Sequence, residues 1–174
     1  MIKYGQGSIQ AFELLYQRHK GASYRYFLRQ CHDQTEAEDL MQELWGRVIK
    51  AKDKYRQQAQ FNTWFYRIAH NLLVDHHKHL SVVNNIIKPS QSEAIDQRET
   101  NSPEPSLIHQ KQALRLKECL TKLPKVQLET FLIKQESGLN IAEISGVVDA
   151  STEAIKSRLR YAIASLKQCI GGLS

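Results

Sequence analysis

Residues 140–166 read NIAEISGVVDASTEAIKSRLRYAIASL, and this stretch predicts two helices joined by a short turn. Asn140 followed three residues later by Glu143 is typical of a capped helix start. A tight turn through Asp149 leads to Ser151, which can cap the second helix. Two helices joined by a turn of three to four residues are the signature of a helix–turn–helix.

The second of these helices has a polar face with groups that can bind DNA. At about 100° per residue, Glu153, Lys156, Ser157 and Arg160 share one face, with Arg158 beside it. Such a helix fits a major groove, where some side chains hold phosphates and a few reach base edges. A solvated helix in an ordinary bundle has the same pattern, and from this stretch alone the two alternatives are about equally favoured.

Helical spacing of apolar residues continues through most of the chain, so we expect an all-α fold without strands. One helix is predicted over 9–31. Thr35 followed by Glu38 predicts a capped start for the next, and a third is predicted over 62–79. Residues 81–106 hold three of the four prolines and many Ser, Asn and Gln residues, which indicates a flexible linker. Two small helical domains, 1–80 and 107–174, are therefore expected.

Composition narrows the class of protein. The chain has 174 residues and a formal net charge of +6, and this modest basic excess fits a polyanionic partner or a protein that is simply basic. Three widely spaced cysteines support neither a disulfide framework nor a zinc site, so we expect buried thiols in a reducing cytosol. No signal peptide is visible and no apolar run is long enough for a membrane span, so a cytoplasmic protein is expected.

Aromatic and basic residues stand together near the middle of the chain. Phe61, Trp64 and Phe65 lie beside a run of polar residues that begins at Arg67. Exposed aromatic rings can stack unpaired bases, and cations beside them can follow a nucleic-acid strand. Because aromatics at helical spacing are usually core, we assign Phe65 to the core and expect an exposed edge for Trp64.

An acidic face lies on the preceding helix. Glu36, Asp39 and Glu43 fall within an arc of about 60°. Three acids on one face of a basic protein suit a basic partner surface, although a solvated face balanced by Arg47 and Lys50 is the simpler interpretation.

Enzyme-like signals are few. Asp75-His76-His77 spells a motif found in some metal-dependent phosphoesterases, but adjacent helical residues diverge by about 100° and no strand-borne acids are expected. The sequence has neither a glycine-rich phosphate loop nor a nucleophile elbow. We therefore expect no enzyme activity, no metal and no cofactor, with the phosphoesterase kept as an alternative.

Taken together, these segments resemble the extracytoplasmic-function (ECF) group of bacterial sigma factors. Residues 38–43 (EDLMQE) are similar to the family's polymerase-binding helix in region 2, and 61–71 (FNTWFYRIAHN) to its promoter-melting and minus-ten segment. Leu123-Pro124 begins a stretch similar to region 4, and 142–144 with 155–159 match its helix–turn–helix. The family often has Gly where this chain has Asp149, and Asp tolerates the left-handed conformation that the turn needs.

The resemblance implies a sigma factor that binds RNA polymerase core enzyme, recognises promoter DNA and helps to melt it. The residues that it assigns to polymerase binding are Glu36, Asp39, Leu40, Gln42 and Glu43. Those assigned to the minus-ten element and melting are Phe61, Trp64, Arg67, His70, Asn71, Asp75, His76 and Lys78. Those assigned to the minus-thirty-five element are Ser151, Thr152, Glu153, Lys156, Ser157, Arg158 and Arg160.

Partners follow from the same resemblance: RNA polymerase core enzyme, promoter DNA and, as a further possibility, an anti-sigma factor. The alternative function is a two-domain helix–turn–helix regulator that acts without polymerase. It would explain the C-terminal motif but neither the acidic helix nor the aromatic segment.

Overall fold

The chain, seen here in a computed structural model, is described over residues 1–86 and 107–171, and every regular element within these ranges is an α-helix. The N-terminal half contains α1 (Ile2–Gly5), α2 (Ile9–Cys31), α3 (Gln34–Lys50) and α4 (Phe61–Ile86). The C-terminal half contains α5 (Leu107–Thr121), α6 (Lys125–Ser137), α7 (Ile141–Val148) and α8 (Thr152–Gly171). The predicted all-α fold is confirmed.

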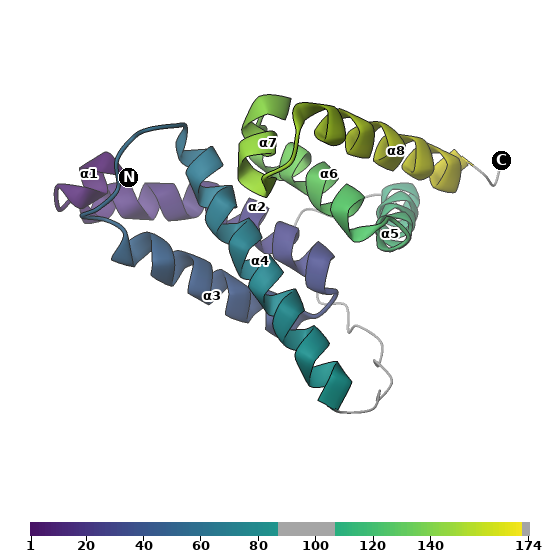
Figure 1. Ribbon diagram of the computed structural model, residues 1–174, viewed down its shortest axis with the longest axis horizontal. Coiled ribbons are helices and arrows are strands. Elements are labelled where there is room, and N and C mark those ends of the chain that lie inside the picture. The colour runs from purple at the N-terminus through teal and green to yellow at the C-terminus, as the bar shows by residue number, and fades with distance from the viewer. Residues whose placement is uncertain (87–106, 172–174) are drawn as a thin grey trace.

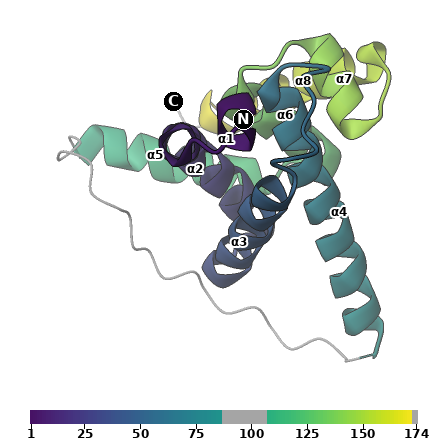
Figure 2. The same ribbon diagram turned by 90° about the vertical axis from the view of Figure 1, so that its left-hand side faces the viewer.

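The start of the predicted linker is helical. Residues 81–86 continue α4 to Ile86, so the helix expected over 62–79 is longer than its apolar pattern indicated. Residues 87–106, the rest of the predicted linker, lie outside the described part of the chain. The C-terminal end of α4 projects beyond the other helices in both views (Figures 1 and 2).

The predicted cap of α3 was wrong. Asp33, not Thr35, is the N-cap, and its Oδ1 accepts a hydrogen bond from the Glu36 amide at 2.8 Å. Asp33 has an extended backbone, which an N-cap requires, whereas Thr35 already lies inside the helix. The helix therefore begins earlier than the Thr35–Glu38 pattern indicated.

The predicted caps of the helix–turn–helix are confirmed. The Glu143 amide donates to Asn140 Oδ1 at 2.9 Å and the Asn140 amide donates to Glu143 Oε2 at 2.8 Å, which completes the capping box. Asp149 ends α7 in the left-handed conformation, with φ 49°. Ser151 Oγ then accepts from the Ala154 amide at 3.2 Å at the start of α8.

Aromatic side chains dominate the core of the N-terminal half. Tyr26, Phe27 and Phe65 are fully buried, and Trp45 packs against Phe65 with ring centroids 5.3 Å apart. Aromatic pairs of this kind add about 0.5–1.5 kcal/mol beyond the area that they bury. The assignment of Phe65 to the core is confirmed, and the packed rings hold α2, α3 and α4 in register.

The two halves pack directly against each other rather than standing apart. Helix α2 lies against α6, and α4 lies against α7 (Figure 1). Buried apolar residues of both halves belong to one hydrophobic cluster, from Phe27 and Leu44 to Ile133 and Ile155. The arrangement brings the start of α4 under the first helix of the helix–turn–helix.

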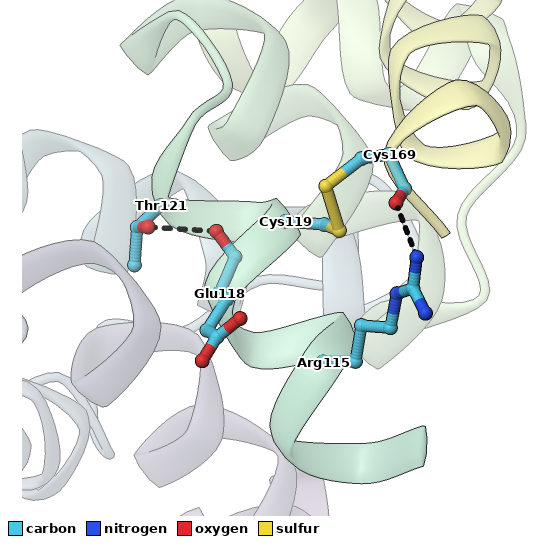
Figure 3. The surroundings of a disulfide bond; sticks show 5 residues. All are labelled: Arg115, Glu118, Cys119, Thr121 and Cys169. Carbon is cyan, nitrogen blue, oxygen red and sulfur yellow. Dashed lines mark hydrogen bonds between the residues drawn. A yellow bond between two sulfur atoms is a disulfide. The ribbon is translucent and has the colours of Figure 1, made fainter. Parts of the chain in front are cut away.

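A disulfide joins α5 to the end of α8, contrary to the expectation of buried thiols. Cys119 and Cys169 are bonded, with their Cα atoms 5.9 Å apart, and Arg115 Nη2 donates to the Cys169 carbonyl at 3.2 Å (Figure 3). The two cysteines are 50 residues apart in sequence, but α5 packs against α8 and brings them together. Cys31 is the free cysteine.

Candidate functional site

The acidic surface of α3 is smaller than the sequence indicated. Asp39, Gln42 and Glu43 are exposed, and their spacing of three and four residues places them on one face. Glu43 Oε1 accepts a hydrogen bond from Arg47 Nη2 at 2.6 Å, an exposed pair that contributes about 0–1 kcal/mol. We call Asp39, Gln42 and Glu43 the acidic patch.

Two residues predicted for the same surface lie elsewhere. Leu40 is 5% exposed and packs in the core. It therefore anchors α3 and is not available as a surface contact for polymerase. Glu36 is half-buried, and its Oε2 lies 3.0 Å from His76 Nε2 of α4. Glu36 thus faces the interior side of the N-terminal half instead of extending the acidic patch.

The aromatic residues at the start of α4 form a packed group that is partly open to solvent. Trp64 is half-buried, with its ring centroid 4.9 Å from that of Tyr55 and 5.7 Å from that of Phe61. Phe61 also packs against Phe65 at 5.4 Å. The exposed part of Trp64 is available for stacking, while Tyr55 and Phe61 fix the orientation of its ring.

Four predicted residues of α4 are exposed: Arg67, Asn71, Asp75 and Lys78. Spacings of four, four and three residues place them on one face of the helix. Three of the four can contact a phosphate: Arg67 and Lys78 as cations, and Asn71 as a hydrogen-bond donor. We call these residues the α4 stripe.

His70 is not free for DNA in this arrangement. Its Nδ1 lies 2.6 Å from Glu129 Oε1 of α6, and both side chains are mostly buried. Asn62, the second residue of α4, donates through Nδ2 to the Ser137 carbonyl at 2.9 Å. The start and middle of α4 are therefore bonded to the C-terminal half.

The helix–turn–helix presents its predicted residues in two groups. Those that are exposed are Ser151, Thr152, Glu153, Lys156 and Arg160, and those that are half-buried are Ser157 and Arg158. Lys156 Nζ donates to Glu153 Oε1 at 2.7 Å, and the Arg160 guanidinium lies 5.1 Å from the ring centroid of Tyr161. The exposed group forms one surface along the first three turns of α8.

Sequence reasoning missed the polar contacts that join the halves. Glu136 of α6 accepts hydrogen bonds from Arg25 at 2.7 Å and from Arg29 at 3.1 Å. The Tyr26 hydroxyl donates to Glu129 Oε1 at 2.9 Å. Burial first, and then the charge of Glu129, raises the pKa of Tyr26, so the phenol remains a donor. These partners are more than 100 positions apart, and no local sequence pattern indicates which residues pair over such a separation.

Cys31, at the end of α2, lies beside the Glu36–His76 pair. One ligand-type atom from each of the three residues lies within 4.8 Å of the other two. Burial, followed by the charges of Glu36 and Asp33, raises the pKa of the Cys31 thiol to about 12. In the absence of a bound cation this thiol is protonated at neutral pH.

Comparisons with known proteins agree with this architecture. The sigma-70 region 2 family model matches residues 15–81, which cover most of α2, α3 and most of α4. In the part of the chain that the structure describes, no helix has the length and apolarity needed to span a membrane.

Curated relatives match over most of the chain. The ECF RNA polymerase sigma factor BldN of Streptomyces coelicolor is 27% identical over 166 residues, which are 94% of this chain and 62% of BldN. The ECF RNA polymerase sigma factor SigK of a Mycobacterium species (strain KMS) is 26% identical over 175 residues, covering 94% of this chain and 84% of SigK. The chain thus spans less than two thirds of BldN but most of SigK.

A solved structure has the same fold. The sigma factor RpoE of Bartonella quintana, in complex with the anti-sigma factor NepR, superposes with a TM-score of 0.79 at 16% identity. The match covers 95% of this chain and 100% of RpoE. At this identity the likeness concerns the fold alone.

Proposed function

The chain belongs to the extracytoplasmic-function group of the sigma-70 family, and from this premise we propose that it binds RNA polymerase core enzyme and directs it to particular promoters. It recognises promoter DNA and helps to melt it, and its contribution to initiation is binding rather than catalysis. Its place of action is the cytoplasm, where polymerase and promoters are found.

The acidic patch is the proposed contact with polymerase. Asp39 and Glu43 are exposed on one face of α3, while buried Leu40 and Leu44 anchor that helix from the other side. A surface charge held on a well-packed helix can meet a basic partner surface without rearrangement of the backbone. Complementary charges of this kind speed association and orient the partners.

The α4 stripe and Trp64 are the proposed contacts with the minus-ten region. Arg67, Asn71 and Lys78 would hold the strand, while Asp75 in the same stripe would favour base amino groups over phosphates. The exposed part of Trp64 supports a role in stacking on a base that has left the duplex. Phe61 acts through Trp64, because it packs against that ring.

The C-terminal surface on α8 is the proposed contact with the minus-thirty-five region. Lys156 and Arg160 are suited to base edges or phosphates, and Ser151 and Thr152 lie at the helix start, where amides bind anions. The observation that carries the whole proposal is the presence, in one chain, of this capped helix–turn–helix and of the exposed acidic patch on α3. A regulator that acts without polymerase has no use for the second surface.

An anti-sigma factor is a further proposed partner. The structural neighbour RpoE is bound to the anti-sigma factor NepR, and the present chain has the same fold. A protein that covered the acidic patch or α8 would prevent polymerase or DNA binding by simple occlusion.

Run-off transcription tests the proposed function. Core polymerase would transcribe a library of genomic fragments with and without the full chain, and new transcripts with defined start sites are expected only with the chain present. DNA binding by the chain alone, without any new transcript or retention of core enzyme, would favour the regulator that acts without polymerase.

A further inference from the structure

We propose that Cys31, Glu36 and His76 form a binding site for a divalent transition-metal ion of the zinc class. The proposal does not rest on the sigma-factor function, since it concerns only how three helices of the N-terminal half meet. It departs from the expectation of a chain without metal, which was drawn from the Asp75-His76-His77 motif.

The three side chains come from three different helices and converge on one point. Cys31 is the last residue of α2, Glu36 lies in the first turn of α3, and His76 lies in the middle of α4. Their ligand-type atoms all lie within 4.8 Å of one another, the only such group of three in the described residues. Ligands of a tetrahedral zinc ion are separated by roughly 3.3–3.8 Å, given bond lengths of about 2.0–2.3 Å. Small side-chain rotations are therefore enough to bring all three within bonding distance of one ion.

The donor set is one that zinc prefers. Thiolate, imidazole and carboxylate are the three protein ligands of Zn²⁺, and a sulfur donor disfavours Mg²⁺ and Ca²⁺. Three protein ligands leave a fourth position for water. The Glu36 side chain is 34% exposed and that of His76 is 19% exposed, which gives an ion a path from solvent.

The surroundings are anionic and pre-arranged. Besides Glu36, the carboxylate of Asp33 acts electrostatically on Cys31. Asp33 also caps α3 through its bond to the Glu36 amide, so the ligand-bearing turn is held in place before an ion arrives. Binding replaces the thiol proton with the ion, and that proton is released to the solvent.

A bound ion would join the end of α2, the start of α3 and the middle of α4. A simple Glu36–His76 pair beside a half-buried thiol is the competing interpretation, and it involves no contact between sulfur and a metal. The two interpretations differ in whether the Cys31 sulfur bonds to an added ion, which Co²⁺ reports directly through its absorption spectrum.

Cobalt titration of the full, untagged chain is the test. The chain is freed of metal with a chelator and kept with its Cys119–Cys169 disulfide intact, so that Cys31 is the free cysteine. We expect a thiolate-to-cobalt charge-transfer band together with intense visible bands of tetrahedral Co²⁺, and their loss when Zn²⁺ is added. Absence of the charge-transfer band at saturating Co²⁺ would overturn the proposal.

Matched variants locate the ion. Cys31→Ser should abolish the charge-transfer band, and His76→Gln should weaken Co²⁺ binding by at least about tenfold. His79→Gln is the control, because His79 is exposed on the same helix and should leave the titration unchanged. Far-UV circular dichroism verifies that each variant is folded. A band that persists with unchanged affinity in folded His76→Gln would also overturn the site.

Protection of the thiol gives a readout that needs no variant. Saturating Zn²⁺ should slow alkylation of Cys31 by iodoacetamide in the wild-type chain by at least about tenfold, whereas Mg²⁺ should not. Equal alkylation rates with and without Zn²⁺ would contradict coordination by Cys31.

Discussion

Glu129 Oε1 of α6 lies 2.6 Å from His70 Nδ1 of α4, so a carboxylate and an imidazole meet across the junction between the two halves. The same Glu129 oxygen accepts a hydrogen bond from the Tyr26 hydroxyl, and Glu136, two turns further along α6, binds Arg25 and Arg29. These contacts hold the C-terminal half against α2 and α4. His70 was predicted to contact promoter DNA, but its side chain is already bonded to Glu129.

Removing both glutamates should loosen the junction. In Glu129→Ala/Glu136→Ala, the loss of hydrogen bonds to charged groups should weaken packing by about 1.5–3 kcal/mol for each residue. Values near the lower end are expected for Glu136, because the Arg25 side chain is 52% exposed and screened by water. Small-angle X-ray scattering should report a larger radius of gyration. Glu118→Ala, an exposed change on α5, is the control, and an unchanged radius in the double variant would show that apolar packing alone holds the halves.

Charge reversal in the acidic patch should weaken binding to core polymerase. Asp39→Lys/Glu43→Lys replaces two attractive charges with two repulsive ones, while surface changes usually alter stability by about 0.5 kcal/mol or less. Retention on immobilised core enzyme measures the effect, and higher salt should reduce the difference. Glu13→Lys/Glu118→Lys changes the net charge equally at exposed positions elsewhere. Equal loss in both double variants would mean that net charge, and not the acidic patch, governs binding.

Truncation of Trp64 should impair DNA melting more than closed-complex binding. Stacking on an aromatic side chain is worth about 1–3 kcal/mol per base, and only unpaired bases expose a free face. Permanganate footprinting of the holoenzyme on a promoter would measure unpaired thymines in Trp64→Ala, with Trp64→Phe as the conservative control. A pre-melted template should rescue Trp64→Ala. Failure of that rescue would assign the defect to the packing of Trp64 against Tyr55 and Phe61.

Exposed cations of α8 should differ in what they contribute to promoter binding. Each lost phosphate contact should reduce the slope of log affinity against log salt by about 0.9. Loss of a contact to a guanine edge should cost about 1–3 kcal/mol and relax preference at one base pair. Holoenzyme binding to a library of upstream elements at several salt concentrations would separate these effects in Lys156→Ala and Arg160→Ala. Lys167→Ala, further along α8, is the control, and wild-type slope and preference in both test variants would exclude α8 as a DNA-reading helix.

Reduction of the Cys119–Cys169 disulfide should destabilise the chain. A cross-link that closes a loop of about 50 residues contributes about 2–4 kcal/mol, mainly by restricting the unfolded chain. Urea unfolding with and without a reductant would measure the difference. Cys119→Ser/Cys169→Ser should be less stable than the oxidised wild type by the same amount and insensitive to the reductant. A reductant effect that persists in this variant would have to come from Cys31.

Local signals carried most of the successful fold prediction. The capping box of α7, the turn at Asp149 and the cap at Ser151 each depend on groups within three residues of one another, so a single sequence contains the complete signal. The prediction of the α3 cap was wrong even though its signal was also local. The Thr35–Glu38 spacing pointed to Thr35, but α2 ends at Cys31 and the backbone is already helical from Gln34, so Asp33 is the residue in the cap position.

Long-range features could not be predicted in the same way. Cys119 lies beside Leu120 and Cys169 lies three residues after Leu166, so both are near apolar positions of their helices, and this placement was the available signal. Because the chain has three cysteines, an odd number, no disulfide was predicted. Glu129 and Glu136 gave no such signal, because nothing local distinguishes a carboxylate that binds another half of the chain from one that faces water.

The disulfide also limits how this chain can be divided into interchangeable parts. A chimaera that exchanges only residues 140–166 keeps both caps and the turn, and it leaves Cys119 and Cys169 in place to bond. A chimaera that exchanges everything after Gly138 takes Cys169 away from Cys119, and each product then carries an unmatched thiol. An exchange of segments therefore preserves the bond when both of its boundaries lie between Cys119 and Cys169, or when neither does. The covalently linked unit at this end of the chain runs from α5 to the last turn of α8 and is wider than the helix–turn–helix itself.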